Sequence, residues 1–298
     1  MLLYSSVLKK IIKKFFILVS RLPFSFLYGF SNILYFIIYY IIGYRKKVVK
    51  NNLLIAFPDK TEHERKKIQK EFYKNFSDFM VELIKTFSMK REDYKDRIKF
   101  VNLDITQQCI HEKKDVILLS GHMFNWEWLS GISPDLQQKH KYAVYKKVAS
   151  NFFDQSVHES RSRYGTIPLT VKEVGRTMLK LPNDGSHIFL FVADQSPFKS
   201  RIHYELNFFN RLTPAFNGYD KIACRKEYAV LYINMVKIKR GKYEARLKRI
   251  YPDKEKFREN EIVEKFYSEL TQNIKTHPSL WLWSHKRWKY ISGTDYQL

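Results

Sequence analysis

His122 and Glu127 are the two side chains whose types and spacing best suit acid–base chemistry. They follow the short apolar run at residues 116–119, which predicts a buried strand. Gly121 permits a sharp turn after this strand, so His122 would lie at its carboxyl end, where open α/β sheets bind ligands. Asn125 is expected to cap a short helix with Glu127 in its first turn. A carboxylate that holds one imidazole nitrogen leaves the other free to accept a proton.

The wider string around this pair is more informative than the pair itself. A histidine near a strand end is usually an ordinary polar side chain, and His-x4-Glu pairs are common by chance. The whole string Gly-His-x-x-Asn-Trp-Glu at residues 121–127, however, resembles the signature of the lipid A biosynthesis acyltransferases. These lauroyl and myristoyl transferases carry a His-x4-Asp/Glu motif.

Four elements of the chain match the pattern of this family in the same order. They are the box at 121–127, the region Tyr145-Lys146…Asp154…Arg161…Gly165, the segment Asp194-Gln195-Ser196 with Phe208-Phe209…Thr213-Pro214, and the tail Trp-Leu-Trp-Ser-His-Lys-Arg-Trp-Lys at 281–289. Two positions depart from the pattern, because Asn210 and Phe124 stand where glycine is common in the family. These changes leave the chemistry intact and affect the expected acyl or acceptor preference.

The resemblance implies transfer of a fatty acyl chain from acyl carrier protein to a hydroxyl of a lipid A precursor, a step of lipopolysaccharide biosynthesis. His122 would be the general base, and Glu127 would orient its ring. Arg161 would hold a phosphate or stabilise the oxyanion, although a surface role for this arginine is equally open. No Gly-x-Ser-x-Gly elbow is present, and neither a protein nucleophile, a cofactor nor a metal ion is expected.

Five further residues are expected to bind substrate. They are Asn125, Lys146, Asp194, Gln195 and Arg287. For Asp194 a supporting role is favoured over a catalytic one. Arg287 would meet sugar phosphates or the acidic carrier protein, because a guanidinium binds phosphate with two donors. Packing inside the protein is the expected role of at least one tryptophan of the tail.

The charge of the chain points to an anionic partner. There are 53 Lys and Arg against 30 Asp and Glu among 298 residues, a formal net charge of +23. Nucleic acid, a membrane surface and a phosphorylated substrate all fit such a charge, but no nucleic-acid-binding signature is present. Cys109 and Cys224 provide neither a disulfide framework nor a zinc pattern and suit a reducing compartment.

Residues 22–44 contain no charged side chain and are long enough to cross a bilayer. Polar or helix-breaking residues such as Pro23, Gly29 and Asn32 interrupt the segment. A membrane span, a helix lying in the interface and an ordinary buried helix therefore all remain open. We expect residues 1–45 to be a membrane anchor and 46–298 an acyltransferase domain, on the cytoplasmic face of the cell inner membrane.

Strands alternating with helices predict an α/β fold with a mainly parallel central sheet flanked by helices, which the resemblance identifies as glycerolipid acyltransferase-like. Thr61 and Glu64 form a capping-box pattern before a long helix. A strand is predicted at 187–192 and a hairpin around Arg240-Gly241-Lys242. Helices are predicted to begin at Thr213-Pro214 and to cover residues 253–275.

Two alternatives to lipid A acylation are retained. One is an acyltransferase of the same fold whose acceptor is an aminolipid, a glycolipid or an aryl-polyene pigment. The other is a basic protein without enzymatic activity that binds membrane or nucleic acid. The apolar N-terminal segment argues against the second alternative.

Overall fold

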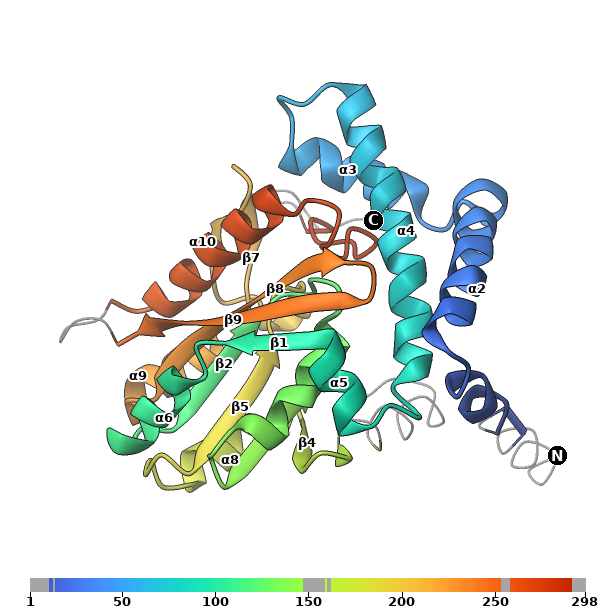
Figure 1. Ribbon diagram of the computed structural model, residues 1–298. Coiled ribbons are helices and arrows are strands. Elements are labelled where there is room, and N and C mark those ends of the chain that lie inside the picture. Colours follow the sequence, from blue (N-terminus) through green and yellow to red (C-terminus); the bar gives the residue numbers. More distant parts are fainter. Residues whose placement is uncertain (1–10, 13, 147–158, 160–161, 253–257, 291–298) are drawn as a thin grey trace, which may run out of the picture.

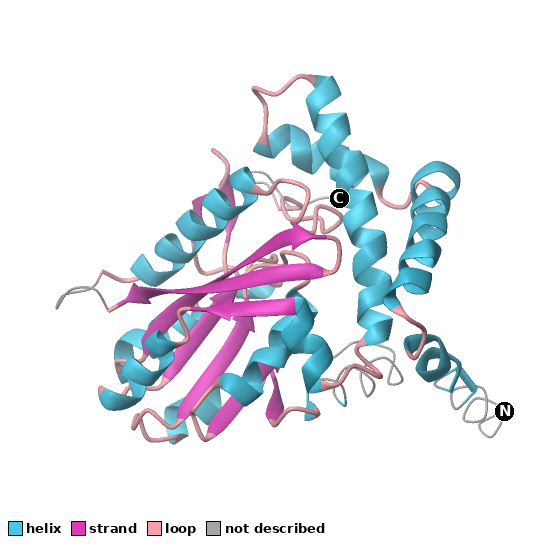
Figure 2. Ribbon diagram, viewed as in Figure 1, coloured by secondary structure: helices cyan, strands magenta, loops and turns pink. Residues whose placement is uncertain are grey.

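The computed structural model contains a seven-stranded sheet. Figures 1 and 2 show this sheet at the centre of the molecule, with helices around it. The structure describes residues 11–12, 14–146, 159, 162–252 and 258–290. The strand order is β1-β9-β8-β2-β5-β3-β4. The strands are β1 (Ile98–Val101), β2 (Val116–Ser120), β3 (His140–Tyr145), β4 (Thr166–Thr170), β5 (His187–Val192), β8 (Ala229–Lys239) and β9 (Lys242–Tyr251).

All neighbouring strands in this sheet run parallel except β8 and β9. These two form the predicted hairpin around Gly241, whose φ of 70° suits the tight turn. Strand β2 lies at the centre between β8 and β5, and its five residues are all buried. The prediction of a mainly parallel sheet flanked by helices is therefore confirmed.

The helices differ in whether they cover the sheet or stand beyond it. Helix α10 packs against β8 and β9, and α9 contacts both α8 and α10. The long α4 and the apolar α2 stand side by side at the right of Figure 1. The helices are α2 (Phe24–Phe36), α3 (Lys46–Ala56), α4 (Glu62–Lys85), α5 (Arg91–Arg97), α6 (Asp104–His111), α8 (Val174–Lys180), α9 (Gly218–Lys226) and α10 (Glu261–Thr276), with the π-helix η1 (Ile37–Ile42) and the 3-10 helices η2 (Trp126–Asp135) and η3 (Lys199–Arg201).

The start of α4 confirms the predicted capping box. The hydroxyl of Thr61 accepts a hydrogen bond from the backbone N–H of Glu64, and the Glu64 carboxylate accepts one from the N–H of Thr61. Two otherwise unpaired backbone donors are satisfied in this way. The segment Phe24–Ile42, by length and composition alone, could cross a membrane.

Two predicted helix starts differ from the structure. Thr213 and Pro214 belong to β7 (Leu212–Pro214), which pairs with β6 (Glu205–Asn207) in a separate two-stranded sheet. The Thr213 hydroxyl donates to the carbonyl of Arg211 and so does not cap a helix. Helix α10 begins at Glu261, later than predicted, and residues 253–257 lie outside the described part of the chain.

Candidate active site

His122 lies just beyond the carboxyl end of β2, as predicted, with 16% of its side chain exposed. The reason for the preceding glycine is different from the one expected. Gly121 is not among the residues with positive φ, but a Cβ at this position would lie 2.5 Å from Cδ1 of Leu270 and 3.5 Å from Oδ2 of Asp194. Glycine therefore allows α10 and the Asp194 carboxylate to approach the backbone next to His122.

The carboxylate that holds the His122 ring is that of Asp194. Its Oδ1 lies 2.5 Å from Nδ1 of His122, and its Oδ2 accepts a hydrogen bond of 3.0 Å from the backbone N–H of His122. Burial by itself raises the pKa of Asp194, but the charge of His122 and hydrogen bonds from His122 and Trp281 outweigh it and bring the pKa to about 2. Asp194 is therefore ionised at neutral pH and favours a proton on Nδ1.

The pairing of two strands explains why these side chains meet. Ser120 at the end of β2 is opposite Val192 at the end of β5, and the N–H of Ala193 donates to the carbonyl of Ser120. His122 and Asp194 each follow two residues after these strand ends. Parallel neighbours therefore deliver both side chains to the same edge of the sheet.

The C-terminal tail completes the support of the site. Trp281 is 2% exposed and donates from its indole N–H to Oδ2 of Asp194 at 2.6 Å. The N–H of Leu282 donates to the carbonyl of His122, and Met123 forms an isolated antiparallel β-bridge with Trp281. The tryptophans Trp281, Trp283 and Trp288 are all buried, so the predicted packing role is confirmed.

The second ring nitrogen of His122 faces Gln195. The distance from Nε2 of His122 to the side-chain nitrogen of Gln195 is 3.1 Å. With the proton on Nδ1, Nε2 carries a lone pair and accepts from this amide. An acceptor hydroxyl that replaced the amide donor would place its proton at the same lone pair, so the geometry suits a general base.

Glu127 takes a different place from the one predicted for the orienting carboxylate. It is the second residue of η2, and its Oε1 accepts a hydrogen bond of 3.0 Å from the indole N–H of Trp126. The Trp126 ring in turn packs edge-on against the His122 ring, with centroids 5.0 Å apart. The carboxylate at Nδ1 in the structure is that of Asp194, whereas Glu127 lies beside Trp126, and the orienting role of Glu127 stays a prediction.

Asn125 caps η2 as predicted, but its side chain is fully buried. Its Oδ1 accepts from the N–H of Glu127 at 3.2 Å, and its Nδ2 donates to Oε2 of Glu82 at 2.8 Å. Both amide atoms are thus used within the protein. Asn125 therefore holds the loop after His122 in place, and its predicted contact with substrate stays a prediction.

Glu82 links this loop to the apolar helix α2. The buried carboxylate accepts hydrogen bonds from Asn125, from the hydroxyl of Tyr28 on α2 and from the hydroxyl of Tyr243 on β9. Burial raises the pKa of Glu82 to about 7, although these hydrogen bonds favour the charged form. Nothing in the sequence patterns pointed to this residue.

This raised pKa predicts a specific dependence of stability on pH. Glu82 in the folded protein holds its proton up to about pH 7, whereas the unfolded chain loses it near the ordinary value of 4.5. The protonated carboxyl of Glu82 therefore contributes to the stability of the folded state by on the order of 3 kcal/mol. This contribution is fully present below the unfolded-state pKa of 4.5 and is lost as pH rises through the folded-state pKa of about 7. Because glutamine at position 82 does not titrate, we expect Glu82→Gln to lose less stability between pH 5 and pH 8 than the unchanged chain. Melting temperatures at the two pH values measure this, and equal losses in both proteins would contradict it.

Three predicted site residues remain, the binding residues Lys146 and Arg287 and the catalytic candidate Arg161. Lys146 is exposed after β3, with its ammonium 4.2 Å from the centroid of the Phe198 ring. Arg287 is 0% exposed and donates to the carbonyl of Pro214 and the hydroxyl of Tyr267. This buried arginine contacts the protein interior, and its predicted contact with phosphates stays a prediction. Arg161 lies outside the described residues.

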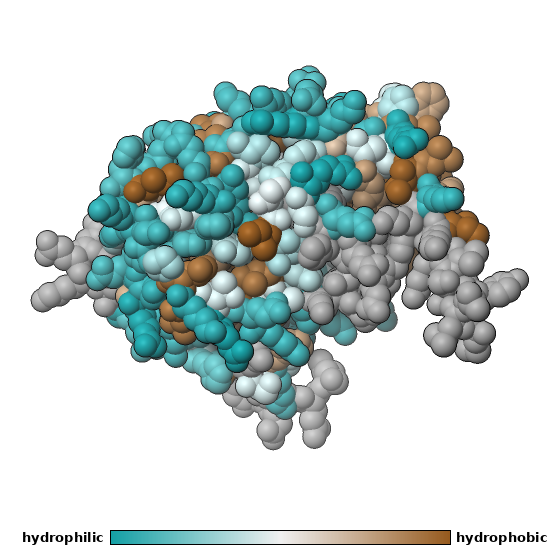
Figure 3. Space-filling view, turned by 90° about the horizontal axis from the view of Figure 1, so that it is seen from below, coloured by the Kyte–Doolittle hydropathy of each residue, from teal (hydrophilic) through white to brown (hydrophobic). Residues whose placement is uncertain are grey.

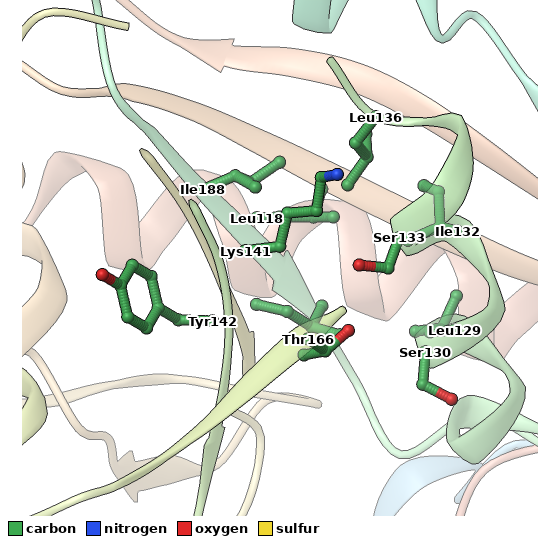
Figure 4. Close-up of a pocket in the computed structure, with 11 residues that line it drawn as sticks. Leu118, Leu129, Ser130, Ile132, Ser133, Leu136, Lys141, Tyr142, Thr166 and Ile188 are labelled. Carbon is green, nitrogen blue, oxygen red and sulfur yellow. The ribbon is translucent and has the colours of Figure 1, made fainter. Parts of the chain in front are cut away.

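A mostly apolar cavity lies beneath η2, between this helix and β2, β3, β4 and β5 (Figure 4). Ser133, which is 2% exposed, lines this cavity with a hydroxyl that has no hydrogen-bond partner among the described residues. The lining residues are Leu118, Leu129, Ser130, Ile132, Ser133, Leu136, Lys141, Tyr142, Thr166, Ile188 and Leu190. The cavity is therefore mostly apolar, and it lies against the helix that begins just after the His122 loop.

One group of side chains in the described residues could hold a metal ion, and it lies at the opposite edge of the sheet. It consists of Asp115, Asp184 and His187. Asp115 already accepts hydrogen bonds from the backbone N–H of His187 at 3.0 Å and from its ring at 2.9 Å. Asp115 and His187 thus connect the starts of β2 and β5, and this structural role accounts for the contact between them.

Comparison with known protein families gives one match. Residues 5–290 match the family described as Bacterial lipid A biosynthesis acyltransferase, nearly the full chain. A search of curated proteins finds no match.

Proposed function

Because the chain belongs to the bacterial lipid A biosynthesis acyltransferase family, we propose that it moves a fatty acyl chain from the thioester of acyl carrier protein to a hydroxyl of a lipid A precursor. The observation that carries the mechanism is the His122 ring. Its Nδ1 is held by buried Asp194, and its Nε2 faces a displaceable amide donor. The chain is accordingly an acyltransferase with a histidine base and an aspartate that positions it.

In the proposed reaction, Nε2 of His122 takes the proton of the acceptor hydroxyl as its oxygen attacks the thioester carbonyl. The C–S bond then breaks, and the departing thiolate of the carrier recovers the proton from the imidazolium. Asp194 stabilises the imidazolium while it exists. The acyl group leaves as an ester of the acceptor, and the carrier leaves as a free thiol.

Cationic groups would bind the anionic parts of both substrates. Lys146 is exposed after β3, two strands from β2 in the sheet, and suits a phosphate of the lipid A precursor or an acidic patch of the carrier. Arg161 keeps its proposed role at a phosphate or at the oxyanion. Glu127, next to Trp126, would add negative charge near the imidazolium.

The cavity beneath η2 is proposed to receive the end of the acyl chain. We expect Ser133→Leu to fill part of this space and to lower kcat/KM for a fourteen-carbon donor about tenfold relative to a ten-carbon donor, because one methylene in an apolar pocket changes this ratio by about that factor or more. The test compares both donors with the unchanged chain and with Ser133→Ala, which removes the hydroxyl without adding bulk. An unchanged donor preference in folded Ser133→Leu would contradict the proposal that the acyl chain enters this cavity.

The proposed location is the cytoplasmic face of the inner membrane. A donor bound to acyl carrier protein is a cytosolic substrate, whereas a lipid A precursor is a membrane lipid. The apolar segment Phe24–Ile42 supports attachment to a membrane, and the excess of cations suits anionic headgroups.

Reconstitution tests the proposed function directly. The purified full chain is incubated with a lipid A precursor and a panel of acyl carrier protein thioesters, and the lipids are examined by mass spectrometry. We expect the precursor to gain one acyl group with at least one donor. Transfer to an aminolipid or another lipid, with none to the precursor, would assign a different acceptor. No transfer from any donor would contradict the acyl carrier protein assignment.

A further inference from the structure

The face of α2 and η1 that points away from the protein is almost entirely apolar. Phe26, Phe30, Ile33 and Phe36 are between 53% and 64% exposed, and Ile41 and Ile42 of η1 are more exposed still. Their spacing of three and four residues places the α2 side chains on one face. Figure 3 shows hydrophobic residues at the edge of the molecule where α2 lies. A soluble helix normally shows water its polar face.

The opposite face of the same helix is joined to the protein by polar contacts. The hydroxyl of Ser31 donates to Asp78 of α4 at 2.7 Å, and the hydroxyl of Tyr28 donates to Glu82 at 2.8 Å. Arg240 of the β8–β9 hairpin donates to the side chain of Asn32 at 2.9 Å. These contacts connect α2 to both α4 and the sheet. If α2 entered a membrane, the neighbouring parts of the protein would therefore lie at the same depth in the bilayer.

This attachment is incompatible with a helix that crosses the bilayer. With Phe24–Ile42 as a span, Ser31 would lie about 10 Å and about 16 Å from its two ends, deep in the hydrocarbon. Asp78 would lie at the same depth, together with its ion-pair partners Lys237 at 3.3 Å and Arg240 at 2.6 Å. Charged side chains at that depth are strongly unfavourable unless they face a polar interior. The body of the protein would have to enter the membrane with α2.

We propose that α2 and η1 lie in the plane of the membrane surface, with the exposed apolar face in the lipid and the catalytic body in the aqueous phase. Arg21 before α2 and Arg45 and Lys47 after η1 are exposed, so cations flank the apolar face at both ends. The partner is an anionic phospholipid surface, which binds such a helix through buried apolar area and headgroup attraction together. This inference rests on the proposed membrane location and specifies how the chain is attached.

Single cysteines on either side of α2 distinguish this arrangement from a span. Arg21→Cys and Lys47→Cys are introduced into the full chain with Cys109 and Cys224 changed to serine. Intact spheroplasts are then treated with a membrane-impermeant maleimide. We expect both cysteines to react only after lysis. Reaction of one alone in intact spheroplasts would overturn the proposal, because the two ends would lie on opposite sides. Reaction of both would retain the in-plane helix and overturn only the cytoplasmic location.

Vesicle binding tests the apolar face without any measurement of activity. We expect the full chain to sediment with phosphatidylglycerol vesicles more than with phosphatidylcholine vesicles, and less at high salt. The double variant Phe30→Glu, Ile33→Glu should reduce binding at least about tenfold. Leu179→Glu, at a 43% exposed position on α8, is the matched control and should bind normally. Normal vesicle binding by the double variant would overturn the proposal. It would also be overturned if the double variant only dissociated a dimer, because the apolar face would then contact a second copy of the chain.

Discussion

Replacement of His122 by alanine is expected to lower the turnover number of acyl transfer by roughly two to four orders of magnitude. The variant lacks the nitrogen that accepts the proton of the acceptor hydroxyl, whereas the substrate-binding surfaces remain. The effect should therefore appear in kcat more than in KM. Initial rates with acyl carrier protein thioester and lipid A precursor measure both constants.

Folding must be measured together with this rate, because the variant leaves the buried Asp194 without its ring partner. Thermal melting gives the folded fraction under the assay conditions, and rates are expressed per folded molecule. His111→Ala, an exposed position at the end of α6, is the matched control and should keep full activity. A folded His122→Ala protein with turnover within about tenfold of the unchanged chain would assign the base to another residue.

Local sequence signals predicted those elements of the fold that depend mainly on neighbouring residues. The continuous apolar run predicted β5 with its observed bounds, His187–Val192, and the capping box predicted the start of α4 at Glu62. The helix start predicted at Thr213-Pro214 was wrong because contacts with distant residues determine the structure there. There, pairing of β7 with β6 and the hydrogen bond from Trp288 to the Thr213 hydroxyl decide the local structure. Tertiary contacts overrode a local helix-start pattern.

The composition of the active site depended on strand order, which the sequence patterns did not contain. His122 was found because it stands in a recognisable string, but its true partner lies 72 residues further along the chain. Two strands that are neighbours in the sheet, β2 and β5, are separated in sequence by β3 and β4. Had this order been known, the equal offset of His122 and Asp194 from their strand ends would have identified the pair.

The tail residues show a second limit of sequence patterns. A run of tryptophan and cations suggested a surface that meets phosphates, yet Arg287 is buried within 6 Å of the Phe208 and Tyr267 rings. The aromatic residues that enclose it come from separate parts of the chain. A positively charged side chain in the sequence therefore does not by itself indicate exposure, because Arg287 is buried whereas Lys146 after β3 is exposed.

Replacement of Asp194 by asparagine is expected to be nearly as damaging as loss of His122, about two to four orders of magnitude in kcat. An asparagine of almost the same shape can still accept from the backbone N–H of His122 and from Trp281. Its NH₂ group, when it faces the ring, donates to Nδ1 and leaves the proton on Nε2. The imidazole then has the wrong tautomer to act as a base, and its cation has lost the adjacent negative charge.

The comparison of Asp194→Asn with Glu127→Gln decides which carboxylate orients His122. Asp194 is bonded to Nδ1 and to the backbone of His122, whereas Glu127 accepts from Trp126 beside the ring. We therefore expect Asp194→Asn to lose clearly more activity than Glu127→Gln when both are compared per folded molecule. A KM close to that of the unchanged chain in Asp194→Asn would show that substrate binding survives and that the loss is chemical. The reverse order of losses would return the orienting role to Glu127 and would require its carboxylate to move to the ring when substrate binds.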